Sequence, residues 1–476
     1  MNYFKSIIRF PTGLIILIIL ISFGIRVYNL NYNSPFLDEA QYIVLGKKVL
    51  AGHWQEADPF SWVGGMPLFY PTISAIFSFF GILGSRLFNV ILGTVSVFLI
   101  YLFSKSLGLS NDDKKNEIIG LISASFLVVL AIPIYLSRLA IYDMLSFSLF
   151  LLGLVLLVHA TKIKNPEEMQ METRLFLSAT AFSLSFLAKY ITIISFPFIL
   201  IWTLYYSKKL GKDRVLLFLN YFAAPLVIAT AGYIVWNFPQ LLHFIQDQAS
   251  APRNMSSEII TQFARYLALP AFFAVFGTLG LAIKRKWFWV FTLTAAAVIT
   301  PAVHLVLNNF AAAHQHTFLS LIFILPLAGY FLANFFVNNR WIGSVALIVV
   351  LGFSLGYSQA QLTQLQSSWP NTNSAMNYLK STTSNHERVL SFEADVTKLA
   401  LKDLDERKIT GVFEFKYKKL SGETAYQQAL TDSFFDLVLF NKETHEEVGL
   451  AIKDSFTNHY ALVYDEHTFA VYKLNE

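Results

Sequence analysis

The chain has 476 residues and is too apolar to be a soluble globular protein. Hydrophobic residues make up 55% of it and charged residues 14%, whereas a soluble domain carries about a quarter charged residues. The mean hydropathy is +0.51. The net charge is only +5, so we expect basic loops between membrane spans and no nucleic-acid binding. The sequence contains no cysteine, which excludes disulfides and thiolate metal sites.

Apolar runs of roughly twenty residues predict about eleven transmembrane helices. Lys5 and Arg9 precede the first run, and no small-residue cleavage site follows it, so we expect an uncleaved first span. The predicted spans lie near residues 12–30, 84–106, 117–135, 142–160, 174–189, 191–207, 215–236, 266–283, 287–306, 317–337 and 341–358.

Basic residues cluster in alternate short loops, and this asymmetry predicts the orientation of the chain. Examples are the loops at residues 208–214 and 284–286. Such loops stay on the cytoplasmic side. We therefore expect a cytoplasmic N-terminus, an outward-facing first loop and, because the number of spans is odd, a C-terminal tail outside the plasma (inner) membrane.

The segment from residue 31 to residue 83 is too long for a simple turn between two spans. Its apolar pieces, Tyr42–Leu50 and Leu68–Phe80, are shorter than a span, so we expect helices that lie in the membrane interface. Trp54 and Trp62 suit that depth. Such helices would roof a cavity over the outer ends of the spans.

From about residue 370 the chain becomes polar, and short β-type runs alternate with helix-like runs. This alternation predicts a small α/β domain, and the absence of a glycine-rich phosphate loop argues against nucleotide binding. The predicted fold is an all-α polytopic membrane domain over residues 1–360 followed by a C-terminal α/β soluble domain over residues 361–476. The predicted strands lie at residues 388–392, 411–415, 435–440, 460–464 and 468–472, and the predicted helices at 374–380, 396–404, 424–430 and 443–455.

Two adjacent carboxylates, Asp38 and Glu39, stand where the first apolar run gives way to the outer loop. They would lie in the first turn of the helix-like run that follows Pro35, where unpaired backbone N–H groups favour acidic side chains. The simplest interpretation is a helix cap. The alternative is a functional pair, because one carboxylate beside another has a raised pKa, which suits a general base.

Several short motifs together resemble the polyprenyl-phosphate-sugar glycosyltransferases of the C superfamily, nearest the branch of the protein O-mannosyltransferases and the lipid A aminoarabinose transferases. The resemblance covers about the first 360 residues. Members of that family often carry a lysine before the proline of the second motif, where this chain has glycines and a methionine. The motifs are Leu37-Asp38-Glu39-Ala40-x-Tyr42, Pro67-Leu68-x-Tyr70, Ser85-Arg86-Leu87-Phe88-Asn89-x-x-x-Gly93, Ser137-Arg138-Leu139-Ala140-x-x-Asp143 and Leu187-Ala188-Lys189-Tyr190.

The resemblance implies an inverting hexosyl- or pentosyltransferase that moves a sugar from a polyprenyl (dolichyl or undecaprenyl) phosphate to an acceptor hydroxyl. An active site on the outer face needs a donor that carries its own membrane anchor, because sugar nucleotides do not cross a bilayer. A carboxylate must take the proton of the hydroxyl, and cations must hold the charge of the phosphate that leaves. The acceptor stays open among a protein, a lipid and a glycan.

The motifs and this chemistry assign roles to individual residues. Asp38 is the expected base, and Glu39 is expected to orient Asp38 or to help it hold a divalent metal ion, which the resemblance allows without requiring. Arg138 and Lys189 are the candidate ligands of the donor phosphate, with snorkelling to the interface as the alternative for each. Asp143 is expected to pair with Arg138.

Other polar residues receive supporting or structural roles. Tyr42 belongs to the first motif, and His314 and His316 lie together in an outer loop that could contact phosphate or metal. Without a third ligand at a recognisable spacing, they do not define a metal site. Arg86 is expected to be a topology anchor, and Arg253 and Arg265, which flank the long outer loop, are minor candidates for the lipid phosphate or the acceptor.

Two other classes of protein remain as alternatives. A transporter or flippase of lipid-linked sugars would carry ionisable groups in mid-span and broken helices in paired positions, whereas the charges here cluster at one membrane face. An inactive scaffold that displays the C-terminal domain is the other alternative. An oligosaccharyltransferase is disfavoured, because Trp369-Pro370 does not supply its Trp-Trp-Asp motif.

Overall fold

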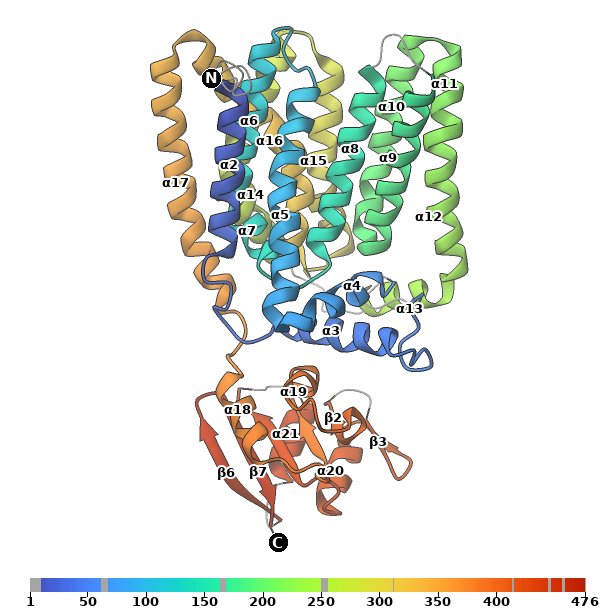
Figure 1. Ribbon diagram of the computed structural model, residues 1–476, viewed down its shortest axis with the longest axis vertical. Helices are drawn as coiled ribbons and strands as arrows, with labels where there is room; N and C mark the ends of the chain where they lie inside the picture. The colour runs from blue at the N-terminus through green and yellow to red at the C-terminus, as the bar shows by residue number, and fades with distance from the viewer. Residues whose placement is uncertain are drawn as a thin grey trace, which may run out of the picture.

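The computed structural model describes residues 10–60, 67–162, 168–249, 256–310, 312–412, 415–443, 447–455 and 459–475. Long helices run side by side in a bundle, and a small sheet region lies beyond one end of that bundle (Figure 1). Trp62, the Gly64–Met66 step and Arg253 fall outside the described residues.

The bundle is built from helices that coincide with each of the eleven predicted apolar segments. Among the described residues, eight helices are long and apolar enough to cross a membrane, and a ninth arises if the bent pair α6–α7 counts as one span. The helices are α2 (Phe10–Val27), α5 (Gly81–Ser106), α6 (Asp113–Val129), α7 (Ala131–Ser137), α8 (Asp143–Lys162), α9 (Glu168–Ala188), α10 (Phe196–Leu210), α11 (Lys212–Phe218), α12 (Ala224–Trp236), α14 (Ser256–Ile283), α15 (Trp287–Leu307), α16 (Ala313–Asn338) and α17 (Arg340–Gln366).

The two remaining members of the predicted eleven, α2 and α9, lie alongside these helices in the bundle (Figure 1). The apolar part of α2, Thr12–Val27, is shorter than the other candidate spans, and α9 begins with charged residues. The number of spans therefore stays a prediction, as does the cytoplasmic position of the N-terminus.

Two short helices, α3 (Leu37–Leu50) and α4 (Phe69–Phe77), lie across the end of the bundle that faces the sheet region (Figure 1). Their crossing requires Gly46, because a Cβ atom there would lie 2.0 Å from the carbonyl oxygen of Pro71. A short 3₁₀ turn, η1 (Ser78–Phe80), then leads into α5 through Gly81, whose φ of 73° favours glycine. Helices were predicted in this segment, and the structure contains them.

The bend between α6 and α7 has a local cause in the sequence. The two helices meet at 64°, and Leu130 between them is extended. Pro133 lacks an amide hydrogen and crowds the carbonyl of the residue four positions earlier, which is Val129, the last residue of α6. The bend carries Ser137 and Arg138 to the end of the bundle where α3 lies.

The C-terminal region forms a five-stranded mixed sheet in the order β2-β1-β5-β7-β6. Strand β1 pairs in parallel with β2 and β5, whereas β7 is antiparallel to β5 and β6. Four of the five predicted strands and all four predicted helices are present, at least in part, in the described residues. The prediction of a strand at residues 411–415 is wrong for its described residues, because β2 ends at Thr410 and β3 begins at Lys416. The elements of this region are β1 (Val389–Ser391), β2 (Ile409–Thr410), β5 (Leu437–Asn441), β6 (Tyr460–Glu466), β7 (Phe469–Leu474), the helices α18 (Asn373–Thr382), α19 (Ala394–Ala400), α20 (Glu423–Thr431) and α21 (Glu447–Asp454), and a hairpin of β3 (Lys416–Tyr417) with β4 (Leu420–Ser421).

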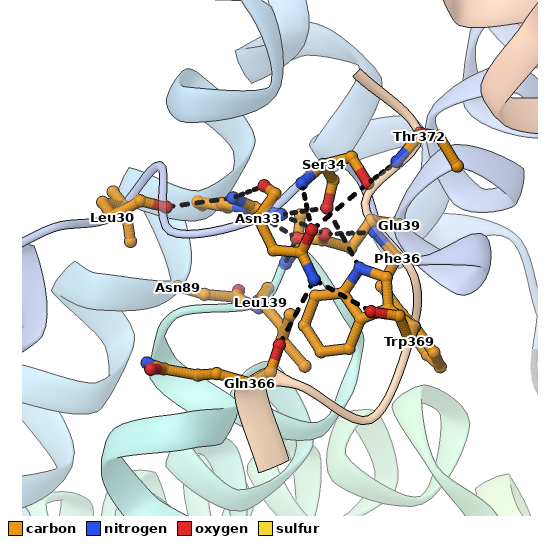
Figure 2. Close-up of polar contacts among 12 residues, drawn as sticks. Leu30, Asn33, Ser34, Phe36, Glu39, Asn89, Leu139, Gln366, Trp369 and Thr372 are labelled. Carbon is orange, nitrogen blue, oxygen red and sulfur yellow. Dashed lines mark hydrogen bonds and ion pairs between the residues drawn. The ribbon is translucent and has the colours of Figure 1, made fainter. Parts of the chain in front are cut away.

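The linker after α17 is held against the outer loop that precedes α3 (Figure 2). The indole nitrogen of Trp369 donates to the carbonyl of Ser34 at 3.2 Å, and the amide of Thr372 donates to the Ser34 hydroxyl at 3.0 Å. Asn33 donates to the carbonyls of Gln366 and Trp369 at 3.2 and 3.1 Å. These contacts fix the start of the Asp38 loop to the linker.

Candidate functional site

Glu39 is fully buried and forms an ion pair with Arg86 of α5. The guanidinium donates from Nε to Oε1 at 2.8 Å and from one NH2 group to Oε2 at 2.7 Å. The amide of Ala140 donates to Oε1 at 2.7 Å, and that of Phe36 donates to Oε2 at 2.9 Å (Figure 2 shows Phe36 beside Glu39). Each carboxylate oxygen thus accepts two hydrogen bonds, which uses its acceptor sites.

This geometry corrects two expectations about the acidic pair. Glu39 has no lone pair left for a metal ion or for Asp38, so a metal held by both carboxylates does not fit these residues. Arg86 is more than an anchor at the membrane surface, because it also donates to the carbonyls of Leu30, Asn33 and Ser34 at 2.9 to 3.2 Å. Together the pair holds the outer loop against α5 and the loop after α7.

Asp38 has different surroundings from Glu39, although the two residues are neighbours on α3. No hydrogen-bond partner of its carboxylate is found in the described part of the chain. Burial raises the pKa of Asp38 to about 6, and the charge of Asp143 adds to this rise, whereas Lys189 opposes it. A carboxylate that is unpaired and titrates near neutral pH has the properties of a general base.

Lys189 lies at the end of α9, beside the start of α8. Its ammonium nitrogen is 2.5 Å from Asp143 Oδ1, 3.1 Å from the amide oxygen of Gln315 and 5.0 Å from the ring centre of Tyr142. Asp143 therefore pairs with Lys189. The prediction that it would pair with Arg138 is wrong. The predicted partner is excluded because α8 directs Asp143 toward the end of α9, with which it packs closely.

Tyr42 lies one helical turn after Asp38 and is buried. Its ring contacts those of Tyr70 and Tyr142, with ring centres 6.0 and 5.2 Å away. These three rings lie between the Asp38 helix and the loop that carries Asp143, so Tyr42 supports the position of α3.

Arg138 and Arg26 form a buried cationic pair at the C-terminal ends of α7 and α2. Arg138 is 8% exposed, donates from NH2 to the carbonyl of Ile25 at 2.5 Å, and leaves Nε without a partner among the described residues. Arg26 is fully buried and donates to the Ser137 hydroxyl at 3.1 Å, to the Leu127 carbonyl at 3.0 Å and to Ser22.

No carboxylate neutralises either guanidinium in the described ranges. Two adjacent charges buried without an acid favour an anion nearby, because an isolated buried cation is costly. Sequence reasoning missed Arg26, although a single arginine at the end of an apolar run is a signal for such a site.

Gly93 and Asn89 of α5 position this cationic pair. A Cβ atom at Gly93 would lie 2.1 Å from the Ser137 hydroxyl and 3.0 Å from Arg26 Nε, so glycine is required there. The Asn89 side chain donates to the carbonyls of Leu139 and Ile141 at 2.5 and 2.7 Å, and so holds the loop after Arg138.

The two histidines predicted in an outer loop lie in the first turn of α16. His316 Nδ1 is 2.8 Å from His304 Nε2, and His304 Nδ1 is 2.6 Å from the carbonyl of Asn309. Since a carbonyl only accepts, a neutral His304 carries its proton on Nδ1. Its Nε2 is then the acceptor, and His316 Nδ1–H donates to that atom. His316 Nε2 is then a buried acceptor, and it has no partner in the described chain.

His314 points elsewhere and lies 6.2 Å from the ring of Tyr135, measured between ring centres. Over the described residues, no group of three or more histidine, aspartate or glutamate side chains could hold a metal ion. Arg265 donates to Gln364 at 3.1 Å, which joins α14 to the C-terminal end of α17.

Comparison with known proteins identifies solved structures with a similar fold. No family model matches the chain, and no curated protein sequence matches it. Among solved structures, ArnT from Cupriavidus metallidurans in its apo state is similar over 97% of this chain and 98% of its own, with a TM-score of 0.68 and 11% identity.

Two further structures are similar over nearly the whole chain. The Archaeoglobus fulgidus oligosaccharyltransferase tethered with an acceptor peptide is covered over 75% of its length, with a TM-score of 0.59 and 13% identity. The arabinofuranosyltransferase AftD from Mycobacteria is covered over 40%, with a TM-score of 0.53 and 14% identity. The chain thus has the fold of the GT-C glycosyltransferases and is an integral membrane protein.

Proposed function

We propose that this protein is an inverting glycosyltransferase that uses a polyprenyl-phosphate sugar on the outer face of the plasma membrane. The observation that carries the proposal is that an unpartnered, partly buried carboxylate, Asp38, and two buried arginines, Arg26 and Arg138, lie at the same end of the bundle. The shared fold supports the class, because similar structures include an oligosaccharyltransferase and an arabinofuranosyltransferase. One of the solved oligosaccharyltransferase structures contains a dolichol-phosphate.

In the proposed reaction, Asp38 accepts the proton of the acceptor hydroxyl. The hydroxyl oxygen forms a bond to the anomeric carbon while the bond from that carbon to the phosphate oxygen breaks, and the electron pair leaves with the polyprenyl phosphate. Arg138, whose Nε is unpartnered, is the proposed clamp for this phosphate, since guanidinium binds phosphate through two parallel N–H groups. Arg26 holds Ser137 beside it and adds a second positive charge.

Lys189 receives a narrower role than the sequence suggests. Its charge is already balanced by Asp143 at 2.5 Å, so it is a weaker phosphate ligand than Arg138. The positive charge of Lys189 lowers the pKa of Asp38 and so opposes the effect of burial. We propose that Lys189 and Asp143 act as positioning residues.

The test is transfer of sugar from radiolabelled polyprenyl phosphate sugar by the purified full chain in detergent. Wild type should form a new glycosidic bond, and Asp38→Asn should lower the rate by a factor of about 10² to 10⁴, the usual loss of a general base. Arg138→Gln should weaken donor binding by about tenfold to a hundredfold, the range of a hydrogen bond to a charged group.

Arg407→Gln is the matched control, because Arg407 forms an exposed ion pair with Asp405 in the C-terminal region, outside the proposed site. It should retain the wild-type rate. Equal transfer by wild type and Asp38→Asn would remove Asp38 as the base. Uptake of lipid-linked sugar into sealed vesicles without a new glycosidic bond would support a transporter instead.

A further inference from the structure

A cavity of about 260 Å³ lies between the outer-loop helices and the C-terminal region, separate from the Asp38 site. We call it the lysine cavity, because Lys47 of α3, Lys380 of α18 and Lys402 after α19 line it. An adjoining cavity of about 420 Å³ shares Lys380 and Lys402. Three elements that are distant in sequence therefore direct basic side chains to one place.

These lysines have no acidic partner that would explain their convergence. None of the three forms an ion pair within the described ranges, and no carboxylate lines the lysine cavity. Glu406 acts on Lys47 through its charge but forms its ion pair with Lys48, at 3.7 Å, and Asp403 lines only the adjoining cavity. Burial and then the charge of Lys402 lower the pKa of Lys47, and the charge of Glu406 opposes this shift without reversing it.

Apolar side chains also line the lysine cavity. Ile43 and Met376 lie one helical turn before Lys47 and Lys380 on the same helices, and Ile82 lies at the start of α5. Between two of the cavity's lining residues, Ser78 and Gly81, stand Phe79 and Phe80, which are 87% and 75% exposed. Two adjacent exposed phenylalanines at the turn where α4 leads into α5 suit contact with acyl chains at the membrane interface.

We propose that the lysine cavity binds the phosphate headgroup of an anionic phospholipid, while Phe79 and Phe80 contact its acyl chains. Basic and apolar side chains line the same cavity, and a lipid with an anionic headgroup can contact both. Free phosphate would use only the lysines, so the pair of phenylalanines favours the lipid. This site lies on the α3–α18 side and is independent of the proposed transfer reaction.

The experiment measures binding of the full chain in dodecyl maltoside to phosphatidylglycerol and to phosphatidylcholine by native mass spectrometry. Wild type should bind phosphatidylglycerol at least about tenfold more tightly. Each neutralised lysine should cost about fivefold in affinity, so Lys47→Gln/Lys380→Gln/Lys402→Gln should lose most of the preference.

The matched control is Lys416→Gln/Lys419→Gln/Lys453→Gln, which removes the same charge from exposed positions elsewhere in the C-terminal region. It should keep the preference for phosphatidylglycerol. The variant Phe79→Ser/Phe80→Ser should weaken lipid binding several-fold. Equal binding of the two lipids by wild type, or equal losses in the two triple variants, would overturn the proposal.

Two measurements on the wild type alone make the test independent of variant folding. Phosphatidylglycerol should slow the modification of Lys47, Lys380 and Lys402 by an amine-reactive reagent and leave that of Lys416 and Lys419 unchanged. Inorganic phosphate at equal concentration should give no such protection. Protection by inorganic phosphate as strong as that by the lipid would show a free-phosphate site and contradict the lipid assignment.

Discussion

Asp38 and Glu39 are adjacent on α3 but face different partners, and this difference separates their roles. Glu39 accepts four hydrogen bonds and is fully buried, so it holds structure. Asp38 has no partner in the described chain and a pKa of about 6. Titratable neighbours whose environments diverge in this way are a frequent mark of an acid–base site.

The raised pKa of Asp38 predicts how the transfer rate depends on pH. A base must be ionised, so the rate should be constant above about pH 7 and fall tenfold per pH unit well below pH 6. The measurement is the rate of sugar transfer by the purified chain from pH 4.5 to 8.5. Asp143→Asn removes a charge that raises this pKa, so it should move the midpoint to lower pH; a profile flat down to pH 5 in wild type would contradict the assignment.

Glu39→Gln should destabilise the protein strongly, whatever it does to activity. The substitution leaves Arg86 buried and charged without a carboxylate, which typically costs about 3 to 5 kcal/mol. Thermal unfolding in detergent should show a clear fall in Tm. The control is Glu56→Gln, which removes an exposed carboxylate that pairs with Lys48 and should change Tm far less. A Glu39→Gln variant as stable as this control would refute the structural role.

The partners of these charged residues could not be read from the sequence. The motif placed Arg138 five positions before Asp143, which made that pair the obvious prediction. The structure pairs Asp143 with Lys189 and Glu39 with Arg86, because helix packing decides which ends meet. Spacing along a chain identifies residues that carry chemistry more readily than it identifies their partners.

At the scale of elements, hydropathy predicted most of the fold. Each predicted apolar segment is a helix, since burial in lipid leaves the backbone no other way to satisfy its hydrogen bonds. Four strands of the C-terminal region, β1, β5, β6 and β7, were also predicted from β-type runs, whereas β2 and the β3–β4 hairpin were not. The sequence did not predict the order β2-β1-β5-β7-β6, because pairing between distant strands depends on how the intervening helices pack.

The crossing of α3 over α4 depends on a single residue and gives a sharp prediction. Gly46→Ala places a methyl group about 2.0 Å from the carbonyl oxygen of Pro71, so the two helices must separate and the α3–α4 contact should weaken. The Tm of thermal unfolding and the rate of sugar transfer should both fall. The control is Gly24→Ala in α2, where nothing lies within 4 Å; there the better helix propensity of alanine should leave Tm unchanged or raise it. Equal Tm values in the two variants would show that this close approach does not matter.

At the scale of the whole molecule, the linker after α17 connects the C-terminal region to the loop that carries the proposed base. Trp369 is central to this connection. Its ring centre lies 5.8 Å from that of Tyr32 and 5.2 Å from that of Phe36, and its indole donates to Ser34 (Figure 2). Movement of the linker would therefore reach Asp38 through three residues of the loop, Tyr32, Ser34 and Phe36.

Trp369→Ala should loosen this connection without unfolding the bundle. The loop before α3 loses an aromatic contact on each side and a hydrogen bond, so the linker at residues 367–372 should be cut faster by a protease, and the transfer rate should fall because Asp38 is less well positioned. The control is Trp341→Ala at an 83% exposed position on α17, which removes the same side chain without touching the loop. If Trp369→Ala and Trp341→Ala showed the same cleavage and the same transfer rate, the C-terminal region would have no part in holding the proposed active site.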